Sequence, residues 1–395
     1  MHTFIHQFFE LTITGLAVGA IYALVALGYT MVYGVLQLIN FAHSEVFMYG
    51  TFAMAWVFVF IHGTGSVTES LWHAAPILIL ALIAAMITSG GVALLVERFA
   101  YRPLIKRDAP KLVALISAIG ASFALSETMG LRDRLPHLLA GLAVVLLAFL
   151  ITVVLSRVIA PRLPLGDDPG HDPLILIVSG VIGIVVAKLV VNAVNVSGRL
   201  ESVVGPSRLG SYVNGARNNY SNPITIQPHG LFTIGDYKVT DVDLLVIGAA
   251  LLMMVALELF VRRTRAGRSI RAVAEDPEAA SLMGVNSTRT IQLTFLIGGL
   301  MAGVAATLYM VRIGTTRSDA GFILGVKAFT AAVMGGIGNL RGALLGGLVL
   351  GVAENWGSAF FGDTWKDVVS FVLLVLILLV RPSGILGESL RKARA

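Results

Sequence analysis

The chain has 395 residues, of which 56% are hydrophobic and only 13% are charged. Soluble domains carry roughly 25% charged residues, so a soluble fold of this length could not cover its own surface. The formal net charge of +6 would fit nucleic-acid binding, but membrane proteins gather such an excess in their cytoplasmic loops. The sequence contains no cysteine, which excludes disulfides, thiolate metal sites and a cysteine nucleophile.

Apolar runs long enough to cross a bilayer recur along the sequence. A hydrocarbon core about 30 Å thick needs about 20 apolar residues in a helix. The predicted spans cover residues 11–36, 41–61, 76–98, 111–130, 138–159, 174–195, 242–262, 289–312, 320–338, 341–361 and 366–381. Span 41–61 begins with polar residues, span 320–338 contains Lys327, and span 366–381 is short. The sequence therefore predicts an all-α, polytopic membrane protein, a single domain over residues 1–395, with about nine to eleven transmembrane or re-entrant helices.

Lys and Arg residues indicate which loops face the cytoplasm. Basic clusters follow the third span, the 242–262 span and the last span; they comprise Arg98, Arg102, Lys106, Arg107 and Lys111, then Arg262, Arg263, Arg265, Arg268 and Arg271, then Arg381, Arg391, Lys392 and Arg394. If the spans alternate, all three clusters lie on one side, which the positive-inside rule makes cytoplasmic. The N-terminus and the polar loop 197–241 are then expected outside and the C-terminus inside. Within that loop, Ile224–Gln227 alternates as a short strand would.

Glycines cluster in the early and late apolar segments, where they allow either close helix packing or a broken helix that lines a pathway. The segment 335–339 (GGIGN) is the candidate break. The neighbouring segment 336–342 lacks the lysine and hydroxyl of a phosphate-binding loop, so we expect a tight connection there and no nucleotide site.

Polar residues inside the spans are costly and are functional candidates by default. Asn40, His43 and Glu45 open the second span. A histidine beside a carboxylate can indicate a proton relay or a metal ligand, but two groups do not make a metal site. Hydrogen bonds between helices, or a gate near the cytoplasmic side, are the favoured interpretation.

The late spans contain a second polar group, Lys327, Glu354 and Asn355. Opposite charges in apolar surroundings need partners, so we expect Lys327 to pair with a carboxylate such as Glu354. A role for these three residues in lining a pathway is the alternative.

The segment 267–286 carries the most informative local pattern. Asp276 is a good N-cap, Pro277 fits the first helical position, and Gly284 suits the residue just past the helix end. Acidic residues precede and follow Pro277, at the positive end of the helix dipole. A helix of about two turns is too short to be stable alone, so the membrane domain or a partner must hold it. The candidate docking residues are Arg271, Glu275, Asp276, Pro277, Glu278, Ala279, Leu282 and Gly284.

This segment resembles the coupling-helix region of permeases from bacterial ATP-binding-cassette importers, most closely the branched-chain amino acid (Liv-type) family. Further matching stretches occur in the family's order: 28–34 (GYTMVYG), 39–45 (INFAHSE), 101–104 (YRPL), 114–120 (ALISAIG), 327–338 (KAFTAAVMGGIG) and 366–371 (KDVVSF). The resemblance covers about 11–130 and 231–387.

The sequence departs from the family pattern in two places. Ser44 stands where the family usually has glycine, which puts the backbone turn there in question. Residues 131–197 look like an insertion that supplies two extra spans. A peripheral packing pair and a contact site for an additional partner are both open as roles for this insertion.

The resemblance implies an importer permease fold and a transport subunit rather than an enzyme. It implies a second permease subunit, two cytoplasmic ATPase subunits that bind ATP and Mg, and an extracytoplasmic substrate-binding protein, all at the bacterial plasma membrane. The chain itself would need no cofactor or metal, and residues 275–284 would convey the ATPase movement. A permease of the same superfamily for urea or a sugar, and a secondary transporter or channel without ATPases, are the alternatives. An intramembrane enzyme would need a cluster of catalytic groups, and the sequence shows none.

Overall fold

The computed structural model describes residues 7–62, 67–107, 109–130, 220–222, 224–381 and 383–387. By its internal contacts the chain divides into two compact units, Met1–Ser126 with Asn219–Ala395, and Glu127–Asn218. Apart from residues 127–130, everything described belongs to the first unit. The predicted insertion at 131–197, with its spans 138–159 and 174–195, lies outside the described residues, as does the first part of loop 197–241.

The described residues include seven helices that are long and apolar enough to cross a membrane. They are α2 (Phe8–Leu36), α3 (His43–His62), α4 (Leu71–Val96), the helix Lys111–Gly130, α9 (Asp241–Arg263), α12 (Ser287–Ile313) and α14 (Leu340–Phe361). Two shorter helices are α13 (Ala320–Gly335) and α15 (Lys366–Val380). This arrangement confirms the predicted all-α, polytopic membrane protein, and the helix bounds agree with the predicted spans to within a few residues except at the start of α4.

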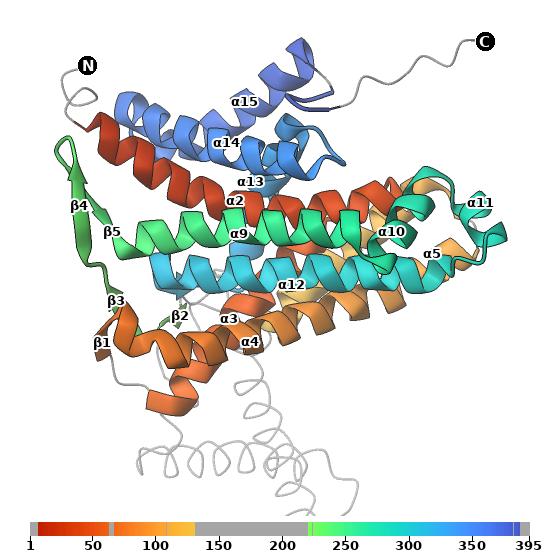
Figure 1. Ribbon diagram of the computed structural model, residues 1–395, viewed down its shortest axis with the longest axis horizontal. Coiled ribbons are helices and arrows are strands. Elements are labelled where there is room, and N and C mark those ends of the chain that lie inside the picture. The colour runs from red at the N-terminus through yellow and green to blue at the C-terminus, as the bar shows by residue number, and fades with distance from the viewer. Residues whose placement is uncertain are drawn as a thin grey trace, which may run out of the picture. The chain divides into compact units, whose positions relative to one another are not determined.

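Helix α2 lies at the centre of the bundle (Figure 1). It packs against α9, α12, α13 and α14, and nearly every residue from Gly15 to Val32 is buried. An apolar helix without a polar face has no side to turn to water, so burial on all sides is the expected outcome.

Glycines bring α2 and α14 into close backbone contact. A Cβ on Gly347 would lie 2.6 Å from the Cα of Ala23, and one on Gly15 would lie 2.7 Å from the Cα of Val352. Any larger side chain would therefore push the two helices apart. This contact supports the close-packing interpretation of the early and late glycines.

The candidate break at 335–339 is a tight connection between two helices. Helix α13 ends at Gly335, and Gly336 and Gly338 have φ angles of 105° and 96°, which L side chains rarely adopt. Asn339 then caps α14 by accepting hydrogen bonds from the N–H groups of Arg341 and Gly342. The predicted span 320–338 was three residues too long, because the left-handed backbone at Gly336 ends the helix.

Short strands gather at one end of the bundle, which we call the strand end (Figure 1). Strand β1 (Val67–Ser70) pairs in parallel with β3 (Ile224–Gln227), β4 (Gly230–Ile234) pairs antiparallel with β5 (Tyr237–Thr240), and β2 (Tyr220–Ser221) pairs antiparallel with β6 (Thr315–Thr316). The predicted strand at Ile224–Gln227 is confirmed, with Ile224 and Ile226 facing inward.

The opposite end, which we call the α11 end, carries the short helices α5 (Arg102–Lys106), α10 (Arg265–Glu275) and α11 (Pro277–Leu282) (Figure 1). Helix α4 reaches α5 through a π-helical segment, Glu97–Tyr101. The carboxylate of Glu97 is buried and accepts two hydrogen bonds from the Arg102 guanidinium, at 3.0 and 2.7 Å. The predicted basic clusters around α5 and α10 lie together at this α11 end.

Candidate functional site

Helix α11 forms where the capping pattern predicts it. The Asp276 carboxylate accepts hydrogen bonds from the N–H groups of Glu278 (2.9 Å) and Ala279 (3.0 Å), and Pro277 occupies the first turn. Gly284 follows the helix with a φ angle of 84°, the left-handed conformation expected there. The predicted short helix is confirmed, with six residues. Its coupling role remains a prediction.

The bundle holds α11 in place through α10. Thr264 caps α10 and accepts a hydrogen bond from the N–H of Gly267, while Ile270 and Val273 are buried against the bundle. Helix α10 contacts α2, α9 and α12, and Ala280 is the buried residue of α11. A helix too short to be stable alone is therefore preformed by tertiary packing.

All eight predicted docking residues are exposed at the α11 end: Arg271, Glu275, Asp276, Pro277, Glu278, Ala279, Leu282 and Gly284. Leu282 and the adjacent Met283 are 89% and 86% exposed, among the most exposed large apolar side chains described. Met283 is not among the predicted docking residues, although an apolar pair inside a polar, basic segment is a visible signal. We call Leu282 and Met283 the apolar tip.

Asn40, His43 and Glu45 are buried, and each contacts a different helix. The Asn40 side-chain oxygen accepts a hydrogen bond from Tyr101 (3.2 Å), and Glu45 accepts one from Ser122 (3.3 Å). The His43 ring packs edge-on against the Tyr29 ring, with centroids 4.9 Å apart. The predicted hydrogen bonds between helices are thus confirmed for Asn40 and Glu45.

Ser44 adopts ordinary helical backbone in the first turn of α3. Its hydroxyl donates to the backbone oxygen of Phe41 (2.8 Å), and its side chain lies against Gly325 of α13. The serine therefore stands in ordinary helical backbone, and Gly325 on the facing helix leaves room for its side chain.

Lys327 pairs with Glu354, as predicted, at 3.1 Å. A second carboxylate, Asp367 at the start of α15, lies 2.8 Å from the same ammonium group. Tyr22 of α2 donates to the Glu354 carboxylate at 2.9 Å, and Ser370 also donates to it. We call these five side chains the Lys327 cluster; it joins α2, α13, α14 and α15. Sequence reasoning found the central pair and missed Tyr22, Asp367 and Ser370.

A second ion pair, which sequence reasoning missed entirely, lies near the strand end. Arg312, near the end of α12, contacts Asp243 at 2.5 Å. Asp243 also takes part in the capping box of α9 with Thr240 and accepts a hydrogen bond from Tyr237 at 2.9 Å. Partial burial, followed by the hydrogen bond to the Asp243 carboxylate, raises the pKa of Tyr237, so its hydroxyl remains a neutral donor.

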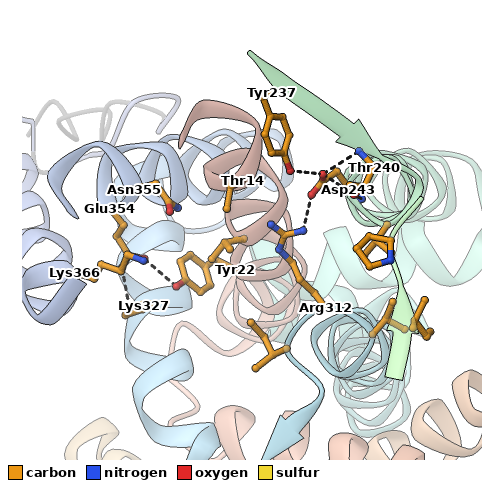
Figure 2. Close-up of a pocket in the computed structure, with 16 residues that line it drawn as sticks. Thr14, Tyr22, Tyr237, Thr240, Asp243, Arg312, Lys327, Glu354, Asn355 and Lys366 are labelled. Atoms are coloured by element: carbon orange, nitrogen blue, oxygen red, sulfur yellow. Dashed lines mark hydrogen bonds and ion pairs between the residues drawn. The ribbon is translucent and has the colours of Figure 1, made fainter. Parts of the chain in front are cut away.

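A cavity of about 560 Å³ lies between these two charged groups. Figure 2 shows Lys327, Glu354 and Tyr22 on one side of it, and Arg312, Asp243 and Tyr237 on the other. Residues of α2, α9, α12, α13, α14, α15 and the strand segment contribute to its walls. Of the predicted pathway residues, Lys327, Glu354 and Asn355 line the cavity, whereas Asn40, His43 and Glu45 do not.

Within the described part of the chain, no three His, Cys, Asp or Glu side chains come close enough together to hold a metal ion. The polar groups instead form hydrogen bonds and ion pairs between helices. The cavity between these groups is large enough to hold a small polar solute.

Comparisons with known proteins place the chain in a family. A model of the family described as "Branched-chain amino acid transport system / permease component" matches residues 11–159 and 111–378. The high-affinity branched-chain amino acid transport system permease protein BraD of Pseudomonas aeruginosa is 36% identical, over 97% of this chain and 97% of the relative. The corresponding LivH proteins of Salmonella typhimurium and Escherichia coli are 36% and 35% identical, each over 98% of this chain and 96% of the relative.

No solved structure was found that matches the chain. The family assignment therefore rests on the sequence matches, which run along almost the whole chain, together with the multi-pass helical fold. The chain belongs to the family of permease components of branched-chain amino acid transport systems.

Proposed function

We propose that the chain is a permease subunit of an ATP-driven importer and forms part of the pathway for branched-chain amino acids. Three relatives that match almost the whole chain are named as high-affinity branched-chain amino acid permeases. Family membership supports transport of this solute class over urea or a sugar, and transport over catalysis.

The single structural observation that carries the coupling role is the preformed, exposed helix α11 with its apolar tip. ATP binding elsewhere can bias the pathway only through an element that both parts contact. Helix α11 presents Leu282 and Met283 to the outside, while α10 connects it to α2 and α12 in the bundle. A secondary transporter or channel has no need of such a docking helix.

The proposed partners are those that membership of this permease family implies. Two cytoplasmic ATPase subunits, which bind ATP and Mg, dock at the α11 end, and a second permease subunit completes the pathway. An extracytoplasmic binding protein delivers the amino acid at the strand end. The basic residues near α5 and α10 support the proposal that the α11 end faces the cytoplasm of a bacterium, with the N-terminus outside and the C-terminus inside.

The apolar tip is proposed to enter an apolar groove on the ATPase, with Glu275 and Glu278 at its polar rim. Fully burying a large apolar side chain contributes roughly 1.5–3 kcal/mol, so two such anchors are enough to make docking sensitive to truncation. Charges at the rim contribute more to orientation and association rate than to affinity.

Two variants test this proposal in membranes that contain the complete transporter. Leu282→Ala with Met283→Ala should lower co-purification of the ATPase subunits. Charge reversal at Glu275 and Glu278 should uncouple ATP hydrolysis from leucine uptake. Leu386, which is 40% exposed near the C-terminus, provides a matched Leu→Ala control outside α11. A double charge-reversal variant that transports normally and still binds its ATPase would refute the docking assignment.

A further inference from the structure

The cavity between the two charged groups has the composition of a binding site for one chemical class. We propose that it binds a zwitterionic α-amino acid with an aliphatic side chain, as a station on the import pathway. The inference rests on the proposed import function and deepens it by assigning a site. Its volume of about 560 Å³ is in the range of roughly 300–1,000 Å³ typical of small-molecule pockets.

The carboxylate of such a solute would bind at Arg312. This guanidinium contacts Asp243 only through Nη1, and its Nε and Nη2 have no hydrogen-bond partner among the described residues. The planar donor fork of arginine matches a carboxylate with two parallel hydrogen bonds. Tyr237 and Thr240 also donate hydrogen bonds to Asp243 and fix the position of its carboxylate. Asp243 in turn fixes the position of the Arg312 guanidinium, whose remaining N–H groups can bind a second anion.

The ammonium group would bind at the opposite wall, beside the Lys327 cluster. Lys327 contacts both Glu354 and Asp367, and Lys366, the other lysine on this wall, pairs with Asp363, so three carboxylates share two ammonium groups. The excess negative charge favours a further cation beside the buried carboxylate of Glu354. Asn355 adds an acceptor, because its side-chain nitrogen donates to the backbone oxygen of Gly351 and its side-chain oxygen has no partner in the described part of the chain.

The rest of the wall is aliphatic. Val18, Val242, Val311 and Ile313 line the cavity between the two charged groups. Branched aliphatic side chains on the wall suit a branched aliphatic solute, since its burial contributes about 25 cal/mol per Å². The charged side chains on both walls already form ion pairs within the protein. A bound solute therefore gains less electrostatic stabilisation than it would from unpaired charges. Weak binding of this kind allows the solute to leave again, as transport requires.

The strand segment provides the entrance side of the site. Ile226 and Pro228, Tyr237 of β5 and Thr240 lie on the cavity wall, and all belong to the loop expected outside the membrane. A solute released by an external binding protein would therefore reach this cavity before the α11 end. The site is predicted to act early in the import cycle.

The test uses the complete transporter in nanodiscs, without binding protein, and tritiated L-leucine as the probe. Leucine should compete for the bound label. Both 4-methylpentanoate, which lacks the ammonium group, and 3-methylbutylamine, which lacks the carboxylate, should compete about tenfold less well or worse. If 4-methylpentanoate competed as well as leucine, the assignment of the ammonium group to the Lys327 cluster would be wrong. If 3-methylbutylamine did so, the assignment of the carboxylate to Arg312 would be wrong.

A cavity-filling variant adds a test that preserves both ion pairs. Val311→Phe on α12 should lower leucine binding and uptake about tenfold. Leu252→Phe on α9, an exposed position outside the cavity, is the matched control and should behave as wild type. Co-purification of the ATPase subunits checks that both variants are folded.

The outcomes separate the cavity assignment from the proposed function. Normal uptake by Val311→Phe would overturn the site and leave the importer intact, whereas absence of ATP-dependent leucine uptake by wild type would overturn the function itself. Phosphatidylethanolamine shares the zwitterionic chemistry and is the competing occupant. Mass spectrometry that finds this lipid bound to wild type, lost from Val311→Phe and not displaced by leucine would assign the cavity to lipid.

Discussion

The two ends of the molecule satisfy their polar groups in different ways. At the α11 end, Asp276 caps the backbone two and three residues ahead of it, and the charged side chains around it are exposed. At the cavity, Lys327 and Arg312 meet the carboxylates of Glu354 and Asp243 from other helices, and these two carboxylates are buried. The polar groups at the α11 end have partners nearby in the sequence, and water can replace those partners. The ion pairs at the cavity form only when the whole bundle is assembled.

This difference has a functional meaning. An element that docks a partner must expose its apolar and charged groups and still keep its shape. A site inside a membrane bundle must pair every charge, because isolated charges there are costly. We therefore expect substitutions at the α11 end to change coupling with little effect on stability, and substitutions at the cavity to change stability first.

The largest effect is expected from Lys327→Met, which leaves Glu354 buried without its cation. Breaking a buried pair by removing one partner costs about 3–5 kcal/mol. Unfolding of the purified protein in detergent, followed by tryptophan fluorescence, measures the loss. Adding Glu354→Leu to the variant should restore most of the stability, because the uncompensated charge is then gone. A double variant as unstable as the single one would contradict this account.

A smaller loss, about 1–3 kcal/mol, is expected from Gly347→Ala. The new methyl group would meet the α2 backbone at Ala23, so the central helix pair must separate. Gly248→Ala on α9 is the matched control, since nothing lies within 4 Å of a Cβ at that position. The same unfolding assay applies, and equal stabilities for the two variants would show that the α2–α14 contact is less tight than described.

Asp276→Ala should cost about 1 kcal/mol, confined to α11, because it removes the N-cap. Amide hydrogen exchange of residues 278–283 should accelerate and leucine uptake should fall, while the unfolding midpoint of the bundle stays unchanged. Asp276→Asn keeps a capping oxygen and should keep both properties. A lowered unfolding midpoint of the bundle would show that the α11 cap also stabilises the bundle, against the expected difference between the two ends.

The smallest effect is expected from Tyr237→Phe, about 0.5 kcal/mol, because Asp243 retains donors from Thr240 and Arg312. The measurement is a midpoint shift compared with Tyr33→Phe, a control tyrosine on α2. A loss several times larger would mean that Tyr237, rather than Arg312, is the main partner of Asp243.

Much of the fold could be predicted from the sequence because its signals are local. Span length follows from continuous apolar runs, and the ends of α11 follow from Asp276, Pro277 and Gly284. The Lys327–Glu354 pair was predictable for another reason: opposite charges in apolar segments have few alternatives to each other. The end of α13 was misplaced because a glycine permits a left-handed turn without requiring one.

The polar residues near the start of α3 show where local reasoning stops. Asn40, His43 and Glu45 are neighbours in the sequence, yet they contact Tyr101, Tyr29 and Ser122 on different elements. Their spacing gave no information on these partners, because the partners come from helices that only the assembled bundle brings close.

The sequence by itself determined that the chain crosses the membrane repeatedly and that a capped helix stands between two of the crossings. Both depend on residues that are neighbours in the chain. Only the tertiary structure decided that Arg312 meets Asp243, 69 residues away in sequence, and that Tyr22 reaches Glu354 across 332 residues. The cavity between these pairs exists because helices distant in sequence pack side by side, and no local pattern encodes such a space.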